Sequence, residues 1–316
     1  MPFLLDPQLS DAAAPLLAAL ADGTPPAVGD WRTRRTQVTK LLRRLSRALP
    51  ANDKVTRCPY KFTAADGTRL CATWYRPAGR PAGSAALFFH GGGMILGSVA
   101  VFDRMIAKYA QDSGIPLLAI DYRLAPEHPH PIPVEDCYSA LLWLHEHATD
   151  LGVDRTRIGV VGESAGGGLA AAVALLARDR RGPRIARQLL VYPMLDDRTV
   201  QPDVHIEPSA FWTYADNETG WQALLGSAAG GDAVEPWAAP ARCQDFSDLP
   251  PTYLEVGEID IFRDESIRFA TGLLGAGVST ELRVIPGVPH SFEWIAPGTD
   301  AAIRAFADRA RWLAGL

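Results

Sequence analysis

The chain has 316 residues, of which 47% are hydrophobic and 21% are charged, and its formal net charge is -5. This composition is typical of a globular protein with one large core, and its slight acidity argues against a nucleic-acid partner. The N-terminal stretch lacks the basic segment of a secretory signal, and Asp6 and Asp11 interrupt its apolar residues. No apolar run approaches the roughly 18 residues that a membrane span needs. We therefore expect a cytoplasmic protein without stable membrane insertion.

The first fifty residues predict helices. Residues 9 to 48 are rich in Ala, Leu and Arg, with a Gly/Pro break at residues 22 to 30. The second helix gathers apolar residues on one face, namely Val38, Leu41, Leu42 and Leu45. We expect its arginines on the opposite, solvated face, which explains the pattern without a membrane anchor.

From residue 54 the pattern changes to strands. Residues 54 to 77 predict two strands joined by a turn at Asp66 and Gly67. Further strands are predicted at residues 85–90, 116–121, 157–162, 187–193, 252–257 and 280–287, and helices near 99–112, 133–148, from 164, 263–275 and 300–314. Such alternation indicates right-handed βαβ crossovers. The expected fold class is α/β, with a mostly parallel eight-stranded sheet and helices on both faces.

One long segment breaks this alternation. Residues 195–245 are too long for a simple crossover and too apolar for a disordered linker. We expect this insert to fold with residues 1–50 into a helical cap over the carboxyl edge of the sheet. The predicted catalytic domain then comprises residues 51–194 and 246–316.

The sequence Gly-Glu-Ser-Ala-Gly at residues 162 to 166 lies at the turn from one strand to the next helix. In such a turn the serine occupies a strained backbone position that exposes its hydroxyl near a helix N-terminus, and flanking glycines let strand and helix pass closely. Ser164 is therefore a candidate nucleophile. A Gly-rich turn with an incidental serine is the alternative, because the pattern alone is short.

A second motif, His-Gly-Gly-Gly at residues 90 to 93, directly follows a predicted strand. The N–H groups of Gly91 and Gly92, completed by that of Ala165, are what an oxyanion hole needs. A phosphate-binding loop is disfavoured because the GxxxxGK[ST] spacing and its lysine are missing. We interpret His90 as a structural hydrogen-bonding residue.

Two further side chains follow the last predicted strands. Asp260 comes just after one strand and His290 lies in a loop just after the next. Serine, acid and histidine in this order are typical of α/β-hydrolase triads, with His290 as base and Asp260 as its orienting acid. Glu258 is an alternative acid.

Other polar residues carry less chemical information. We interpret Asp264 and Glu265, which begin a helix, as first-turn charges or as helix-end contacts. The remaining histidines show no metal-ligand spacing, and the four cysteines form no CxxC pair, so no metal or cofactor is expected. Apolar residues suggest a substrate pocket, with the core of the cap as the alternative interpretation: Met94, Phe211, Trp212, Trp221 and Leu224.

Taken in order, these motifs resemble the hormone-sensitive-lipase-like esterases of the α/β-hydrolase superfamily, also called bacterial esterase family IV. The matching segments are HGGG, DYRLAPEHP, GESAGG, VYPMLDD, DIFRDE and HSF. In that family the acid opens a D-x-[LF]-x-D-E segment, which favours Asp260 over Glu258. The resemblance implies a cofactor-free serine carboxylesterase acting on small-molecule esters of short to medium acyl chain, a cap like the one described above, and frequent homodimers.

Glu163 departs from the family pattern, because many members have Asp before the serine. We expect its side chain to point away from substrate and to hold either the turn or the loop at residues 121–129. Two other functions stay open. One is a catalytically silent small-molecule receptor, like the gibberellin receptor, although that receptor has lost the histidine that His290 supplies here. The other is amide, lactone or acyl-transfer chemistry by the same triad.

Overall fold

The computed structural model describes residues 3–20, 24–79 and 83–316, so part of the predicted break at 22–30 lies outside the described residues. The strands are β1 Val55–Thr63, β2 Arg69–Pro77, β3 Ala85–Phe89, β4 Leu117–Ile120, β5 Ile158–Glu163, β6 Gln188–Val191, β7 Thr252–Gly257 and β8 Thr280–Ile285. The α-helices are α1 Pro7–Leu20, α2 Trp31–Ser46, α3 Val99–Ser113, α4 Ile132–Glu146, α5 Ala165–Asp179, α6 Tyr214–Leu225, α7 Arg263–Gly275, α8 Phe292–Ile295 and α9 Asp300–Ala314. Short 3-10 helices span Glu207–Ser209, Gly226–Ala228 and Pro240–Arg242.

All eight strands form one sheet in the order β1-β2-β4-β3-β5-β6-β7-β8. β2 is antiparallel to β1 and β4, and the remaining neighbours are parallel. The central strands are continuous apolar runs because both of their faces are buried. The next strand along the chain after β3, which is β4, lies on one side of β3, and the following strand, β5, lies on its other side. The strand order therefore reverses at β3. Ligands bind at the carboxyl ends of strands at such a switch point. A functional site is therefore expected at the carboxyl end of β5.

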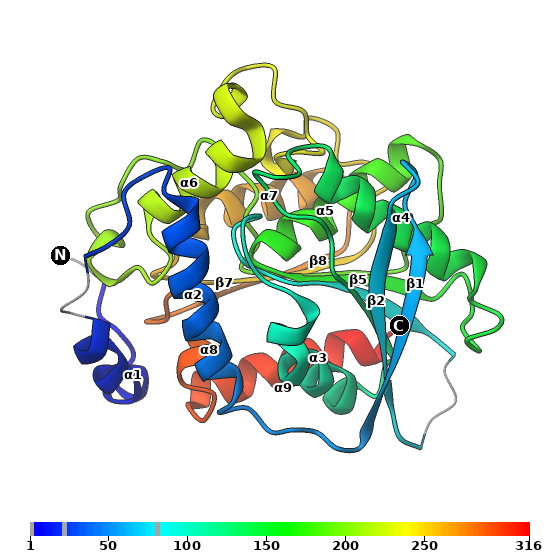
Figure 1. Cartoon of the computed structure of the whole chain (residues 1–316), viewed down its shortest axis with the longest axis horizontal. Coiled ribbons are helices and arrows are strands. Elements are labelled where there is room, and N and C mark those ends of the chain that lie inside the picture. The colour runs from blue at the N-terminus through cyan, green and yellow to red at the C-terminus, as the bar shows by residue number, and fades with distance from the viewer. Residues whose placement is uncertain (1–2, 21–23, 80–82) are drawn as a thin grey trace.

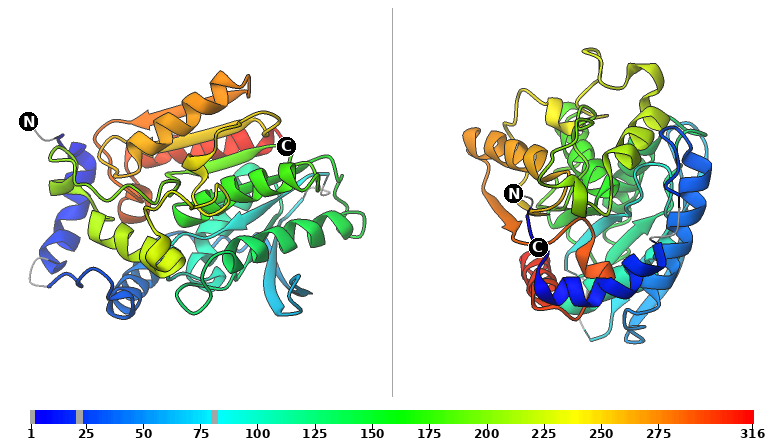
Figure 2. Two further views of the ribbon diagram at one scale, coloured as in Figure 1. Left: turned by 90° about the horizontal axis from the view of Figure 1, so that it is seen from above. Right: turned by 90° about the vertical axis from the view of Figure 1, so that its left-hand side faces the viewer.

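Helices cover both faces of the sheet (Figure 1). α3 and α9 pack together on one face, while α4 and α5 pack together on the other, which also carries α7 (Figures 1 and 2). The predicted α/β fold is confirmed, including the eight strands and the turn at Asp66 and Gly67. The four-residue helix α8 was not predicted, because one turn is too short to show a periodic pattern.

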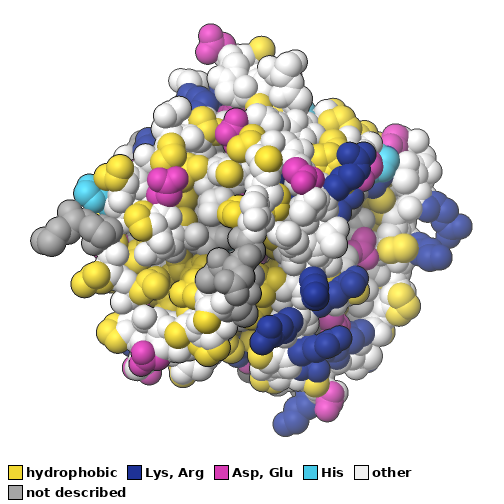
Figure 3. All heavy atoms as spheres, turned by 60° about the vertical axis from the view of Figure 1, so that its left-hand side comes forward, with side chains coloured by type: hydrophobic (Ala, Val, Ile, Leu, Met, Phe, Trp, Pro, Cys, Tyr) yellow, Lys and Arg dark blue, Asp and Glu magenta, His cyan; other side chains and the backbone are white. Residues whose placement is uncertain are grey.

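The N-terminal helix α2 lies against α6 of the insert. The sequence suggested that the arginines of α2 lie on a solvated face. The structure shows that not all of them do. Arg34 is buried and donates to Asp216 and Thr219 of α6, because its guanidinium finds enough acceptors to replace water. Arg43 and Arg44 are exposed as expected, and Figure 3 shows Lys and Arg side chains gathered on one part of this side of the molecule.

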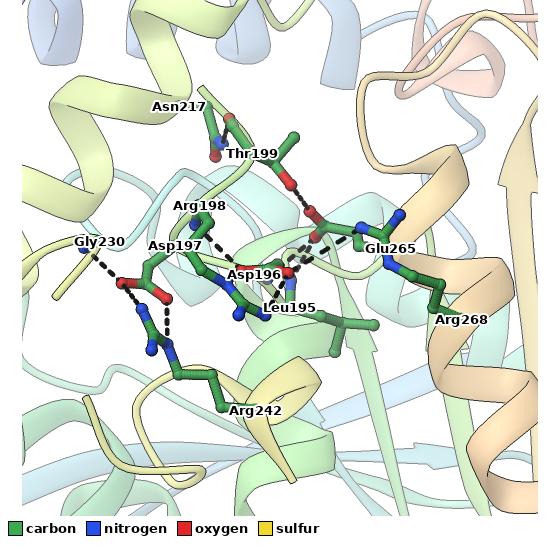
Figure 4. A network of polar contacts seen from close by, with 10 residues as sticks. All are labelled: Leu195, Asp196, Asp197, Arg198, Thr199, Asn217, Gly230, Arg242, Glu265 and Arg268. Atoms are coloured by element: carbon green, nitrogen blue, oxygen red, sulfur yellow. Dashed lines mark hydrogen bonds and ion pairs between the residues drawn. The ribbon is translucent and has the colours of Figure 1, made fainter. Parts of the chain in front are cut away.

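A network of polar contacts attaches the start of the insert to α7 (Figure 4). The carboxylate of Glu265 accepts hydrogen bonds from the backbone N–H groups of Leu195 (2.6 Å) and Asp196 (3.2 Å) and from the hydroxyl of Thr199. Glu265 lies in the first turn of α7, as expected, and its buried carboxylate anchors the start of the insert. Burial raises the pKa of its carboxyl well above the ordinary value.

The neighbouring Asp197 holds the far part of the insert. It accepts two hydrogen bonds from the guanidinium of Arg242, at 2.6 and 2.9 Å, and a third from the backbone N–H of Gly230 at 2.6 Å (Figure 4). The carboxylate of Asp197 thus connects the start of the insert to Gly230 and Arg242 in its later part. Its treatment as a separate cap domain stays a prediction.

Within the described ranges, none of the helices combines the length and the apolar character needed to cross a membrane.

Candidate active site

Ser164 stands at the turn between β5 and α5. Its backbone angles are φ 57° and ψ -119°, a left-handed conformation that costs energy for a residue with a Cβ. The turn needs glycine on both sides. A Cβ on Gly162 would lie 1.9 Å from the carbonyl oxygen of Gly166, and one on Gly166 would lie 2.0 Å from that of Phe89. The sequence around Ser164 thus meets the steric demands of the turn.

The structure brings Ser164, His290 and Asp260 together, although 126 residues separate the first two. The distance from His290 Nε2 to Ser164 Oγ is 2.9 Å, and that from His290 Nδ1 to Asp260 Oδ2 is 2.7 Å. Asp260 is completely buried, and its other oxygen accepts a hydrogen bond from the N–H of Phe262. Such a chain of contacts can pass a proton from hydroxyl to imidazole and stabilise the resulting cation.

Glu258 is not part of this chain of contacts. Its carboxylate accepts a hydrogen bond from the backbone N–H of Gly287, at 3.0 Å, in the loop that leads to His290. Of the two candidate acids, Asp260 is therefore the one that contacts the imidazole.

Two aromatic rings fix the plane of the His290 imidazole. Tyr192 lies edge-on to it with a ring-centroid distance of 4.6 Å, and Phe262 does so at 5.1 Å. Both aromatic residues are buried, so the imidazole has little freedom to turn. The sequence analysis did not assign this role to either residue, although both lie in quoted segments, VYPMLDD and DIFRDE, because ring packing on the imidazole depends on the folded structure.

The loop after β3 places Gly91 beside the nucleophile. A Cβ on Gly91 would lie 3.2 Å from the Cβ of Ser164. Among the described groups, the backbone N–H groups of Gly91, Gly92 and Ala165 have no hydrogen-bond acceptor, and Ala165 begins a helix whose first N–H groups are free by geometry. The carbonyl of Gly92 accepts from Ile95 and Leu96, which fixes the loop.

His90 has the structural role that was expected of it. Its Nδ1 lies 2.8 Å from the carbonyl oxygen of Gly91, and its ring stacks on Tyr122 with a centroid distance of 4.2 Å. Tyr122 donates its hydroxyl to the carbonyl of His90. Burial lowers the pKa of the His90 imidazole, so the ring is neutral and supports the glycine loop.

The predicted pocket residues divide into three places. Met94 and Leu224 line a cavity of about 10 Å³, which has room for one water molecule. Trp212 packs on the glycine loop, since a Cβ on Gly93 would lie 2.5 Å from its ring. Trp221 lines a separate open groove of about 650 Å³ in the insert, and Phe211 is half-buried.

Glu163 points away from Ser164, into the helices. Its Oε1 accepts from the hydroxyl of Tyr109, at 2.8 Å, and its Oε2 accepts from Nε1 of Trp294, at 3.1 Å. These two bonds connect the turn to α3 and α8, so they favour the first of the two expected roles, holding the turn. The loop at 121–129 is held instead by other contacts, among them three hydrogen bonds from Arg123 to Asp136.

Comparison with known proteins gives consistent matches. A family model described as the alpha/beta hydrolase fold matches residues 86–294. The chain is 37% identical over 229 residues to the carboxylic ester hydrolase LipN of Mycobacterium tuberculosis, covering 70% of this chain and 60% of that protein. It is 35% identical to an ethyl acetate hydrolase of Pseudomonas putida, covering 73% and 74% of the two chains. A solved structure titled bacterial heroin esterase is 33% identical, with a TM-score of 0.89, over 98% of this chain and 97% of that one.

Proposed function

The chain belongs to the α/β-hydrolase family, in its hormone-sensitive-lipase-like group, and is a carboxylic ester hydrolase; on that premise we propose that it cleaves short- to medium-chain acyl esters through an acyl-enzyme on Ser164. The observation that carries this proposal is the chain of contacts from Ser164 Oγ through His290 to Asp260, at 2.9 and 2.7 Å.

In the proposed reaction, Ser164 Oγ attacks the ester carbonyl while His290 Nε2 takes its proton. The carbonyl oxygen gains a negative charge, which the N–H groups of Gly91, Gly92 and Ala165 stabilise. The intermediate collapses with loss of the alcohol, which receives the proton from His290, and the acyl group stays on Ser164. Water then repeats the same steps, activated by His290, and releases the carboxylic acid. Asp260 orients the imidazole and stabilises its cation throughout.

We further propose that the substrate's apolar part lies between the glycine loop and the insert. The residues that this assigns to substrate contact are Met94, Phe211, Trp212 and Leu224, while the contact predicted for Trp221 stays a prediction because Trp221 lines the separate groove. The cavity between Met94 and Leu224 has room for one water molecule only, so on this proposal an acyl chain enters it only when one of the two side chains moves. Leu224→Ala is then expected to raise turnover of octanoate relative to butyrate esters.

The test is hydrolysis of p-nitrophenyl acetate, butyrate, octanoate and palmitate. Wild type is expected to turn over the shorter esters, and Ser164→Ala and His290→Ala to lose at least about a thousandfold in kcat. Ser279→Ala changes an exposed serine and is the matched control. A folded wild type without activity on any ester would favour the receptor function. Activity confined to amides, lactones or acyl transfer would keep the triad and change the substrate class.

A further inference from the structure

Fully buried charged side chains lie behind the proposed triad, on the face of the sheet that carries α3 and α9. Glu163 at the end of β5, Glu255 in β7, Glu293 in α8 and Arg309 in α9 are each at most 1% exposed. None of them takes part in the reaction described above. Among the described residues, this cluster therefore combines three carboxylates with one guanidinium.

Glu163 connects the nucleophile to the segment that carries the base. It directly precedes Ser164, and it accepts a hydrogen bond from Trp294, four residues after His290. Its other oxygen accepts from Tyr109, whose own oxygen accepts from Arg309 at 2.9 Å. A displacement of the Glu163 carboxylate would therefore shift both Ser164 and the segment that carries His290, and so change the distance between them.

Glu293 makes a second connection to the base. Its Oε1 accepts from the hydroxyl of Tyr192, at 2.6 Å, and from Nη1 of Arg309, at 2.7 Å. The Tyr192 ring is one of the two that fix the His290 imidazole. Arg309 also pairs with Glu255, so this guanidinium holds both connections in place.

The charges of this cluster do not balance. Three ionised carboxylates around one guanidinium leave a net charge of -2 without solvent, which burial strongly disfavours. Oε2 of Glu293 is the only oxygen of the three carboxylates without a described hydrogen-bond partner. Burial, and then repulsion by Glu293, raise the pKa of Glu163 to about 7. Burial also raises the pKa values of the phenols that face the cluster, so these stay protonated: Tyr109, Tyr192 and Tyr253.

We propose that Glu163 and Glu293 act as positioning residues that hold His290 in line with Ser164, and that Glu163 carries a proton when the site is in this arrangement. The proton removes one of the two uncompensated negative charges, so the two carboxylates tolerate each other beneath the active site. When it leaves, repulsion between them pushes α8, and with it the His290 segment, away from β5. The inference rests on the proposed triad, and it adds an alkaline limit to kcat that belongs to neither His290 nor Asp260.

The experiment compares Glu293→Gln with Glu293→Ala, with kcat and KM measured from about pH 5 to about pH 9. Glutamine keeps an acceptor for Tyr192 and Arg309 and replaces the unpartnered oxygen by an amide nitrogen. Alanine removes both bonds. We expect Ala to lower kcat about ten- to hundredfold with little change in KM, and Gln to recover most of that loss. Wild type is expected to lose kcat above neutral pH, and the Gln variant to keep it there.

Glu281→Gln is the matched control, because Glu281 forms ion pairs at the surface of the molecule; it should follow the wild-type pH profile. Equal kcat values in the Gln and Ala variants, or a Gln variant that loses activity at the same pH as wild type, would overturn the proposal. If Glu293→Ala does not fold, as judged by circular dichroism, the pH profile of Glu293→Gln decides alone. Full activity in Ser164→Ala would instead refute the proposed function, independently of these profiles.

Discussion

Arg34 in α2 donates from its Nε to Oδ1 of Asp216 in α6, at 2.5 Å, and so joins the N-terminal helices to the insert across 182 residues. The same guanidinium donates to the hydroxyl of Thr219, at 2.9 Å, and to the carbonyl of Pro26, at 3.0 Å. Asp216 also caps α6 with Thr213. One side chain thus connects α2, α6 and the segment before α2, and the backbone N–H of Gly29 adds a further hydrogen bond to Thr219, at 3.0 Å.

Arg34→Met keeps the apolar stem and removes the charge. We expect a decrease of about 3 to 5 kcal/mol in the free energy of unfolding, because Asp216 loses its buried partner. Urea unfolding followed by circular dichroism measures it. Arg43→Met, on the exposed face of the same helix, should change the free energy by less than about 0.5 kcal/mol. Equal effects of the two substitutions would show that the buried pair does not matter.

Asp260 and Glu258 differ by two positions and compete for the same role, so a pair of amide substitutions separates them. Asp260→Asn is expected to lower kcat by about 10⁴, because the amide no longer accepts the Nδ1 proton and favours the wrong tautomer. Glu258→Gln leaves one oxygen for the Gly287 N–H and should stay within about tenfold of wild type. Steady-state kinetics on p-nitrophenyl butyrate measures both. A reversed order would assign the acid to Glu258.

The sequence predicted the fold well because its signals are local. Apolar runs of four to six residues alternate with helical segments, and the glycines around Ser164 mark a turn that few other residues allow. Hydrogen bonds and ion pairs between residues that are distant in the sequence give no such local signal. Nothing near Glu163 indicates that its carboxylate bonds to residues 54 and 131 positions away. Arg34 looks like any other arginine of an amphipathic helix until α6 is placed beside it.

The candidate site shows the same division. Ser164, Asp260 and His290 were found because each follows a strand, and parallel strands end at one edge of a sheet. The rings of Tyr192 and Phe262 were missed because side-chain packing around the imidazole depends on three-dimensional register. Residue types alone carry no record of that register.

Gly93 tests the contact between the glycine loop and Trp212. Its φ is 56°, and a Cβ there would lie 2.5 Å from the Trp212 ring. Gly93→Ala should therefore reduce stability more than Gly67→Ala, where φ is 86° and the space is open, so that only a backbone cost of about 1 to 2 kcal/mol applies. Thermal unfolding of both variants measures the difference.

Trp212→Leu should partly rescue Gly93→Ala, because it removes the ring that the new methyl group meets. A double-mutant cycle is expected to give a coupling of about 1 kcal/mol or more. Strict additivity would mean that the loop, rather than the ring, resists the methyl group.

Glu265 and Asp264 are adjacent acids, and their substitutions are expected to change the free energy of unfolding by different amounts. Glu265→Ala removes the acceptor of two backbone N–H groups and one hydroxyl in the interior (Figure 4). It should lower the free energy of unfolding by about 2 to 4 kcal/mol. Asp264 is largely exposed and pairs with Arg263, so Asp264→Ala should cost less than about 1 kcal/mol. Limited proteolysis is a second readout, since loss of the anchor should expose residues 195–199 to cleavage.

The raised pKa of Glu163 predicts how the free energy of unfolding depends on pH. Burial and then Glu293 raise its pKa from 4.5 to about 7 in the folded chain. Between these two values the folded state binds more protons than the unfolded state, so stability falls as pH rises. The contribution is complete below about pH 4.5 and is lost as the pH passes through about 7. Glu163→Gln cannot ionise and should lack this fall, although it loses one acceptor and starts from a lower Tm.

The measurement is the difference in Tm between wild type and Glu163→Gln across that pH range. Other buried acids with raised pKa values, such as Glu265, titrate in both proteins and contribute little to the difference. We expect the wild-type advantage to shrink steadily toward neutral pH. Parallel curves would mean that Glu163 stays ionised throughout, because its bonds to Tyr109 and Trp294 then outweigh burial and repulsion. In that case the cluster would have to hold its proton elsewhere.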